Sequence, residues 1–250
     1  MPDRSSISSI SDRGAIPRPA TIYDPVARAL DVIGDRWTLV LVRHLLLGPK
    51  GFQELRVRTG IAPRVLSGRL RDLAAQGFVE AREGGGYVLT ERGRDLEPIV
   101  SAIARWFTRD GLGALNIDAA SFTETSPQSI LESLPFLLRE EPARNADVTF
   151  EIRLTGPSGG GGVWTVCIQN GACTVSPDFA DHADVRYTAD AKAWCAMALG
   201  LEEPRELLKR GLMTKDGGSQ ALDHYFHQIS RPAGSDRADG SDERHEGEAK

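Results

Sequence analysis

Cysteine is scarce in this 250-residue sequence, which holds only Cys167, Cys173 and Cys195. They form no CxxC pair and have no metal-ligand spacing with a histidine, so we expect neither a disulfide framework nor a metal site. We also expect no other cofactor. Residues 1–112 contain no cysteine at all.

Long apolar runs are missing as well. No stretch approaches the roughly 18 apolar residues of a membrane-spanning helix. The start, "MPDRSSISSISDRGAIPRP", lacks the apolar core of a signal peptide. We therefore expect a cytoplasmic protein with no membrane partner. Residues 1–20 are predicted to be a disordered arm, and residues 230–250, which lack bulky apolar side chains, a disordered tail.

The net charge of −5 is distributed unevenly. Residues 1–112 hold 17 Lys and Arg against 13 Asp and Glu, whereas residues 113–250 hold 13 against 22. Five arginines and no acid lie between Leu55 and Arg71. A local basic stretch of this kind is typical of a nucleic-acid contact, although a solvated helix face has the same composition.

Apolar residues at helical spacing predict four helices in the first part of residues 21–112, before a hairpin and a closing helix. The first follows Asp24, a suitable cap, and begins at Pro25. The second, "TLVLVRHLLLG", is nearly all apolar and is predicted to be a buried central helix capped by Thr38. The third and fourth, "GFQELRVRTG" and "PRVLSGRLRDLAAQG", are close enough in sequence to form a helix-turn-helix.

A hairpin and a closing helix are predicted next. "FVEAR" and "YVLTE" alternate apolar residues around a glycine-rich turn. "TERGRDLEPIVSAIARWFTRDG" is predicted to be one long helix with a single apolar stripe. The stripe consists of Leu96, Ile99, Val100, Ile103 and Trp106. Helices, hairpin and closing helix in this order predict a winged helix-turn-helix domain over residues 21–112.

The composition changes after residue 112. Residues 113–124 are predicted to be a linker, and residues 125–229 a second domain of the α+β class. We expect an amphipathic helix at "SILESLPFLLREE" and strands at "DVTFEIRLTG", "VWTVCIQNGACTVSP", "ADVRYTAD" and "LMTKDG". Further helices are expected at "AKAWCAMALG", "EPRELLKRG" and "SQALDHYFHQI".

The fourth helix has the pattern of a DNA-reading helix. Its leucines fall on one face, and two arginines and a glycine fall on the opposite face, where they can lie close to a major groove. Arg64 and Ser67 are expected at base edges, and Arg69 and Arg71 at phosphates. The alternative for Arg69 is an internal ion pair. The DNA-binding candidates are Arg64, Ser67, Gly68, Arg69, Arg71 and, on the hairpin, Arg82.

Residues 23–110 resemble the HxlR family of bacterial winged-helix transcriptional regulators. The pieces that carry the resemblance are "ALDVIGDRWT", F-x-E-L, VLSxRLRDL and YxLTxRGRxLxPI. The resemblance implies a homodimer that binds a palindromic double-stranded DNA operator and pairs through the first and last helices of this domain. The dimer candidates are then Val26, Leu30, Ile103, Trp106 and Phe107.

Two positions depart from that family. Many members have a cysteine, used to sense oxidants, where this sequence has Asp24, so thiol sensing through that site is excluded. Ala62 stands where the family often has a serine cap before the proline of the reading helix. The helix therefore lacks a side-chain cap that contributes about 0.5–2 kcal/mol.

The segment "ADVRYTADAKAWCAMALG…EPRELLKRGLMTKDGGSQALDHYF" resembles the C-terminal half of a sterol-carrier-protein (type 2) domain. That resemblance implies a five-stranded sheet and helices around an apolar ligand tunnel. The candidate lining residues, each of which can equally be plain core, are Trp164, Phe179, Trp194, Met197, Leu201, Leu208, Met213 and Phe226.

Together these features predict a transcriptional regulator, associated with the nucleoid, whose second domain senses a small hydrophobic ligand. One alternative is a regulator whose second domain only dimerises. Another is a lipid or metabolite carrier or sequestering protein. Cysteines with His182, His224 or His227 suggest a nucleophile only weakly, since cysteine is most often a small core residue. We therefore expect no enzyme.

Overall fold

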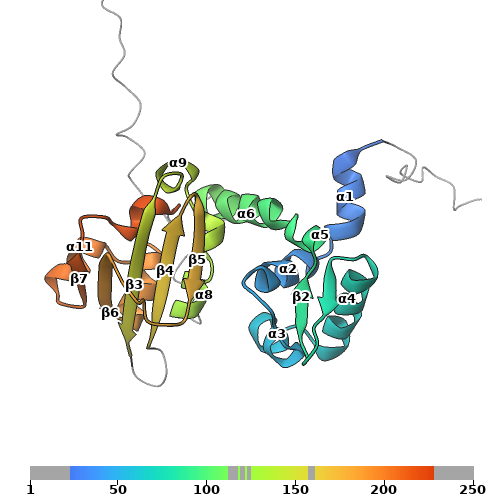
Figure 1. Cartoon of the computed structure of the whole chain (residues 1–250), viewed down its shortest axis with the longest axis horizontal. Coiled ribbons are helices and arrows are strands. Elements are labelled where there is room, and N and C mark those ends of the chain that lie inside the picture. Colours follow the sequence, from blue (N-terminus) through green and yellow to red (C-terminus); the bar gives the residue numbers. More distant parts are fainter. Residues whose placement is uncertain (1–22, 112–117, 119–121, 123–124, 157–160, 228–250) are drawn as a thin grey trace, which may run out of the picture. The chain divides into compact units, whose positions relative to one another are not determined.

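The computed structural model describes residues 23–111, 118, 122, 125–156 and 161–227. The predicted arm, the predicted tail and most of the predicted linker lie outside these residues. The chain forms two compact units, Met1–Glu97 and Pro98–Lys250 (Figure 1). Each unit is described by itself.

The first two helices of unit 1 are where the sequence predicts them. α1 (Pro25–Ile33) begins at Asp24, whose carboxylate accepts hydrogen bonds from the backbone N–H groups of Val26 and Ala27 at 3.0 and 3.1 Å. α2 (Thr38–Leu46) is buried on one side. The prediction that Thr38 caps α2 is wrong: Asp35 accepts from the Trp37 and Thr38 N–H groups, and the Thr38 hydroxyl donates to the same carboxylate.

The helix-turn-helix is confirmed. α3 (Phe52–Thr59) ends at Gly60, whose left-handed φ of +67° is reached easily only by glycine. α4 (Pro63–Ala75) begins three residues later and has no side-chain cap at Ala62. Its three leucines are buried, as their spacing predicts: Leu66, Leu70 and Leu73.

The predicted hairpin is also present. β1 (Val79–Ala81) pairs antiparallel with β2 (Tyr87–Leu89) and forms the wing. The short helix α5 (Glu91–Arg94) follows at once. Gly93 is required there, because a Cβ at this position would lie 2.1 Å from the carbonyl oxygen of Phe78.

The prediction of one long closing helix is wrong. The chain forms α5, then α6 (Glu97–Trp106), then a π-helical turn, η1 (Phe107–Gly111). Pro98 explains the break, because it has no N–H to donate to the carbonyl of Arg94, four residues earlier, and its ring crowds that carbonyl. Only part of the predicted apolar stripe is buried. Leu96 and Val100 are buried, whereas Ile99, Ile103 and Trp106 are exposed.

Unit 2 contains the predicted five-stranded sheet. Its strands are β3 (Asp147–Thr155), β4 (Gly162–Gln169), β5 (Ala172–Ser176), β6 (Val185–Asp190) and β7 (Met213–Gly217). The order is β5-β4-β3-β6-β7, and all neighbours are antiparallel except the central pair β3 and β6. Asn170 and Gly171, with φ of 51° and 79°, form the turn between β4 and β5, and the resemblance to a sterol-carrier domain places Gly171 at this turn.

Two of the predicted helices of unit 2 are broken or shortened. The expected amphipathic helix is divided into α8 (Pro127–Leu131), a 3-10 helix (Leu134–Leu137) that contains Pro135, and α9 (Glu140–Ala143). The expected final helix is a single 3-10 turn (Leu222–Tyr225). α10 (Ala191–Ala198) and α11 (Pro204–Lys209) are as predicted.

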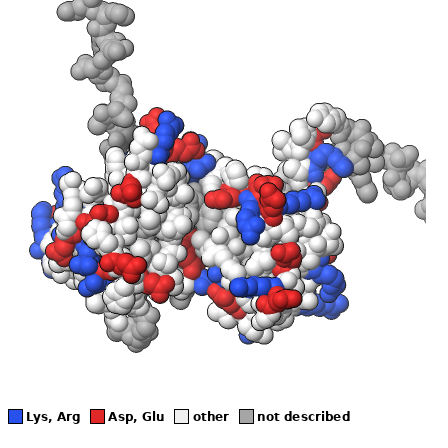
Figure 2. All heavy atoms as spheres, in the orientation of Figure 1, with Lys and Arg blue, Asp and Glu red and all other residues white. Residues whose placement is uncertain are grey.

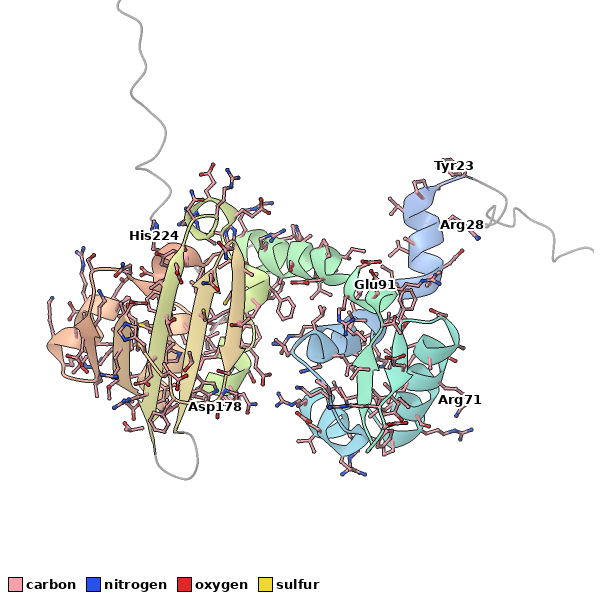
Figure 3. All side chains as sticks on the ribbon, viewed as in Figure 1. Tyr23, Arg28, Arg71, Glu91, Asp178 and His224 are labelled. Carbon is pink, nitrogen blue, oxygen red and sulfur yellow. The ribbon has the colours of Figure 1, made fainter. Side chains whose placement is uncertain are left out.

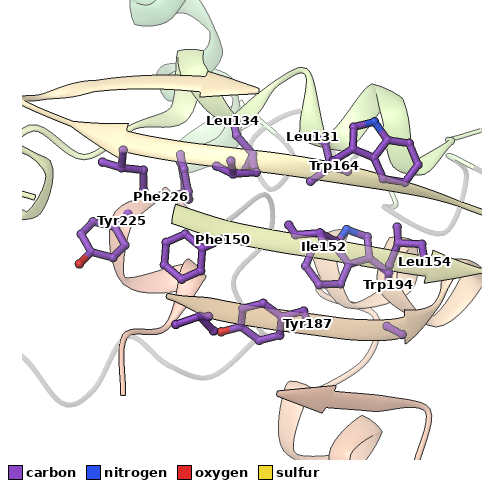
Figure 4. Close-up of a cluster of buried hydrophobic side chains, with 14 of the residues drawn as sticks. Leu131, Leu134, Phe150, Ile152, Leu154, Trp164, Tyr187, Trp194, Tyr225 and Phe226 are labelled. Carbon is purple, nitrogen blue, oxygen red and sulfur yellow. The ribbon is translucent and has the colours of Figure 1, made fainter. Parts of the chain in front are cut away.

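The core of unit 2 lies against one face of the sheet. The rings of Phe150 on β3 and Tyr187 on β6 are stacked, with centroids 6.4 Å apart (Figure 4). The rings of Tyr187 and Trp194 on α10 pack edge to face, with centroids 6.0 Å apart. The opposite face is polar: Glu151 is buried there and accepts from Arg186 and Arg153 at 2.6 and 2.7 Å. The predicted α+β class is confirmed.

Candidate nucleic-acid interface and ligand cavity

The outer face of α4 presents the predicted DNA-reading side chains to solvent. Arg64, Ser67 and Arg71 are exposed, and Figure 3 shows Arg71 pointing away from the helix. Within the described residues, neither arginine makes an ion pair. A Cβ added to Gly68 meets no described atom within 4 Å. This face can therefore approach another surface closely.

Arg69 has the internal ion pair that the sequence left open as an alternative. Its Nε lies 3.4 Å from Asp35 Oδ1, and its guanidinium lies 3.6 Å from Asp72 Oδ2. Burial raises the pKa of Asp35, but the hydrogen bonds from Thr38 and Trp37 and the charge of Arg69 outweigh it and lower that pKa. Asp35 is therefore ionised at neutral pH and ties α4 to the turn before α2.

Arg82 lies on the wing, at the end of β1, and is exposed. Its backbone N–H donates to Gly86 at 3.0 Å, which closes a turn of three glycines with positive φ. Figure 2 shows Lys and Arg side chains over α4 on the edge of unit 1. Sequence reasoning missed Arg56, which is exposed on α3 and is the first arginine of the acid-free run.

Four of the five dimer candidates are exposed apolar side chains. Val26 and Leu30 on α1 are 67% and 57% exposed, and Ile103 and Trp106 on α6 are about half exposed. Phe107 is half-buried in the π-helical turn. On α6 the exposed side chains form a shallow apolar groove, lined by Pro98, Ile99, Ala102, Ile103 and Trp106.

Unit 2 contains a cavity of about 200 Å³ between α8, α10 and the 3-10 turn near the C-terminal end of the described chain. Four of the eight predicted lining residues reach it: Trp194, Met197, Met213 and Phe226. The other four do not. Trp164 is buried with its ring against Gly162, and Phe179, Leu201 and Leu208 are exposed.

The inner wall of the cavity is apolar and aromatic. Trp194 is 3% exposed, and its Nε1 has no hydrogen-bond partner among the described residues. Tyr187 also lines the cavity, and its hydroxyl accepts a hydrogen bond from the Leu222 N–H at 3.2 Å. Burial raises the pKa of Tyr187, so the phenol stays neutral at physiological pH.

The rim of the cavity is polar. Glu202, Glu203 and Asp223 line it, together with His227. Glu202 Oε2 accepts from Arg210 at 2.8 Å, which neutralises one carboxylate. Burial lowers the pKa of His227, as do the positive charges of Arg139, Arg105 and Arg109. The imidazole is therefore neutral at physiological pH.

Sequence reasoning missed this rim and part of the wall. Tyr187 could have been found, because the alternation in "VRYTAD" places it on the buried face with Val185 and Ala189. Leu131, Leu134 and Leu222 come from short helices whose bounds the sequence did not predict.

The three thiols are all partly buried. All are free, and burial, with Cys167 nearby, raises the pKa of Cys173 to about 12. Burial also raises the pKa of Cys195. Such thiols are rarely ionised and are poor nucleophiles at neutral pH.

Across the described ranges, no group of three His, Cys, Asp or Glu side chains is placed to hold a metal ion. Among the same residues, no helix has the length and apolar character needed to span a bilayer.

Unit 1 thus carries the elements of a winged helix-turn-helix DNA-binding protein. The chain belongs to the HxlR-like helix-turn-helix family, whose model matches residues 32–111, and residues 134–225 match the SCP-2 sterol transfer family. The HTH-type transcriptional regulator YybR of Bacillus subtilis is 40% identical over 89 residues, which cover 33% of this chain and 71% of YybR. Regulator Mb3122 of Mycobacterium bovis is 36% identical over 33% of this chain and 56% of its own length.

Among solved structures, the redox regulator HypR in its reduced form is 37% identical, with a TM-score of 0.34. The match covers 37% of this chain and 98% of HypR. The quinone-bound regulator YodB of Bacillus subtilis is 28% identical over 34% of this chain and 94% of YodB, with a TM-score of 0.32.

Proposed function

We propose that this transcriptional regulator responds to a ligand: unit 1 binds a DNA operator, and a small apolar molecule in the cavity of unit 2 changes that binding. The observation that carries the proposal is that one chain combines the exposed arginine face of α4 with a largely apolar cavity. Neither feature is needed to stabilise its own unit.

DNA recognition is assigned to the outer face of α4 and the wing. Arg64 and Ser67, near the start of the helix, contact base edges in the major groove. Arg71, and Arg82 on the wing, contact phosphates. Arg69 also contacts phosphate. Because it pairs with Asp35, it is a positioning residue as well.

The regulator acts as a homodimer on a palindromic operator. Val26 and Leu30 on α1, and Ile103 and Trp106 on α6, are apolar side chains that a monomer leaves in water. Burying them against a second copy removes this exposure. Phe107, half-buried in the turn after α6, is the fifth residue assigned to the dimer contact. Such a regulator works in the cytoplasm on the nucleoid and needs no catalytic activity.

Ligand control requires that the ligand prefers one dimer geometry over another. A hundredfold preference shifts the equilibrium by about 2.7 kcal/mol, enough to empty an operator. The acidic second half of the chain does not favour direct contact with DNA. The ligand therefore acts through the dimer.

The test is fluorescence anisotropy with the full chain and DNA from upstream of its own gene. Wild-type protein should bind salt-sensitively and respond to a small apolar ligand. Met197→Ala should lose the ligand response and keep ligand-free affinity, whereas the control Leu208→Ala, exposed and outside the cavity, should behave as wild type. Absence of DNA binding would favour the carrier alternative, and binding without any ligand response would favour passive dimerisation.

A further inference from the structure

Two carboxylates in the lining of the cavity, those of Glu203 and Asp223, have no ion-pair partner among the described residues. Glu202 also lines the cavity, but it pairs with Arg210. The positive charges of Arg139, Arg105 and Arg109 act on His227, but these arginines do not line the cavity. Glu203 and Asp223 are therefore the unpaired charges in the lining that an entering molecule contacts.

The wall beneath this rim is suited to a cation. Trp194, Tyr187 and Phe226 line the cavity with aromatic rings, whose faces attract a cation within about 6 Å. Aromatic rings beside carboxylates are the combination that recognises organic ammonium groups. A molecule with a carboxylate head would instead meet like charge at the rim and lose affinity.

The volume of the cavity limits the size of its occupant. An apolar cavity of about 150 Å³ holds a benzene molecule, whereas sites for drug-sized ligands measure about 300–1,000 Å³. At about 200 Å³, this cavity holds one ring with a short chain. A sterol or a long acyl chain is too large to be enclosed by it.

We infer that the ligand of this cavity is a small apolar amine, with its ring or chain against the aromatic wall and its ammonium group at Glu203 and Asp223. This inference rests on the proposed function for its biological role but concerns binding alone. It also states what the cavity rejects, namely apolar carboxylates such as fatty acids.

Three probes with one apolar body test the charge preference. 4-Phenylbutylamine, 4-phenylbutan-1-ol and 5-phenylpentanoate share a phenyl ring with four methylenes and differ only in a cationic, neutral or anionic head at pH 7. Isothermal titration of the full chain, without DNA, should show the amine binding at least about tenfold more tightly than the carboxylate, with the alcohol between them. High salt should narrow the ratio.

Substitutions at the rim test whether Glu203 and Asp223 cause the preference for the amine. Glu203→Gln and Asp223→Asn should each reduce the ratio of amine to carboxylate affinity severalfold, and the double variant should nearly remove it. Glu206→Gln is the matched control: Glu206 lies on α11, which begins directly after Glu203, and pairs with Lys209, and it does not line the cavity. Its ratio should equal that of wild type.

Filling the cavity shows where the probes bind. Met197→Trp should abolish binding of all three, and Ala198→Leu, which adds three carbons at the same wall, is the milder second variant if the first does not fold. Equal or tighter binding of the carboxylate, a ratio that the double variant leaves unchanged, or binding by none of the probes overturns the inference.

These titrations contain no DNA, so they test the ligand class independently of the proposed function. An amine that binds with the expected preference but leaves operator affinity unchanged refutes ligand control and keeps the ligand class. An anionic molecule that binds in the cavity and releases the operator supports ligand control and refutes the ligand class.

Discussion

Arg69 in the middle of α4 and Asp35 in the turn before α2 form an ion pair of 3.4 Å, and the same carboxylate caps α2. One side chain thus holds the start of α2 and the flank of α4. Because Arg69 remains partly exposed, it can orient α4 and still be reached from solvent.

Asp35→Asn should destabilise unit 1 by about 1–2 kcal/mol, because it weakens the cap and removes the ion pair. The folded pKa of Asp35 is lowered, so its contribution is fully present above the ordinary aspartate pKa of about 4 and is lost as pH falls through the folded value. Urea unfolding should separate variant from wild type at pH 7 and bring them together near pH 2. Asp31→Asn, whose partner Arg28 is exposed, serves as the control and should show a small difference at both pH values.

Arg64→Ala and Arg71→Ala should affect DNA binding differently. Loss of a base contact at Arg64 should cost about 1–3 kcal/mol and relax sequence preference at one position. Loss of a phosphate contact at Arg71 should weaken all sequences alike and reduce the salt slope by about one. Arg205→Ala on α11 is an exposed-arginine control. If both α4 variants bind the operator as wild type does at moderate salt, the reading-helix assignment is wrong.

Gly68→Ala should separate stability from recognition. Alanine is favoured over glycine inside a helix by about 0.5–1 kcal/mol, and its methyl group meets no described atom within 4 Å. The variant should therefore unfold at higher urea concentration. If Gly68 lies against the DNA groove, the same methyl group should lower operator affinity. A variant that is both more stable and equally tight on DNA would place the groove elsewhere.

Two substitutions of Trp194 in unit 2 should separate the cost of its unpaired N–H from the contribution of its packing. Its Nε1 is buried without a partner among the described residues, an arrangement that costs about 1–3 kcal/mol. Trp194→Phe removes that donor and should leave stability nearly unchanged, since the lost packing offsets the gain. Trp194→Ala should cost about 3–5 kcal/mol by enlarging the cavity. Thermal unfolding of the two variants measures the contrast, and equal losses in both would show that the unpaired N–H costs nothing.

Local patterns in the sequence predicted much of this structure. The leucine spacing of α4, the cap at Asp24 and the alternation of the strands depend on neighbouring residues, so they could be read directly. The capping of α2 by Asp35 could not, because it required knowing that the chain turns at residues 34–37 and brings this carboxylate to the helix start.

The candidate site was predicted only in part, because burial depends on contacts between distant segments. Trp194 and Met197 lie on a helix the sequence predicted, and both reach the cavity. Phe179 has the same apolar character but lies under the guanidinium of Arg153, 5.6 Å from its ring centroid, on the polar face of the sheet. Asp223 and Glu203 converge from separate turns, and nothing in either local sequence indicates that they share a rim.

The last prediction concerns oxidants. Residues 1–112 contain no cysteine, and the three thiols of unit 2 include two whose pKa burial raises, that of Cys173 to about 12. Peroxide reacts with thiolates, which Cys173 and Cys195 rarely form at neutral pH. Peroxide should therefore leave operator affinity unchanged, both in wild type and in a variant with all three cysteines replaced by serine. Anisotropy with and without peroxide measures this, with an exposed-thiol protein as a positive control for oxidation. Release of the operator from wild type, but not from the cysteine-free variant, would show that a buried thiol of unit 2 senses oxidants and would replace the cavity as the origin of regulation.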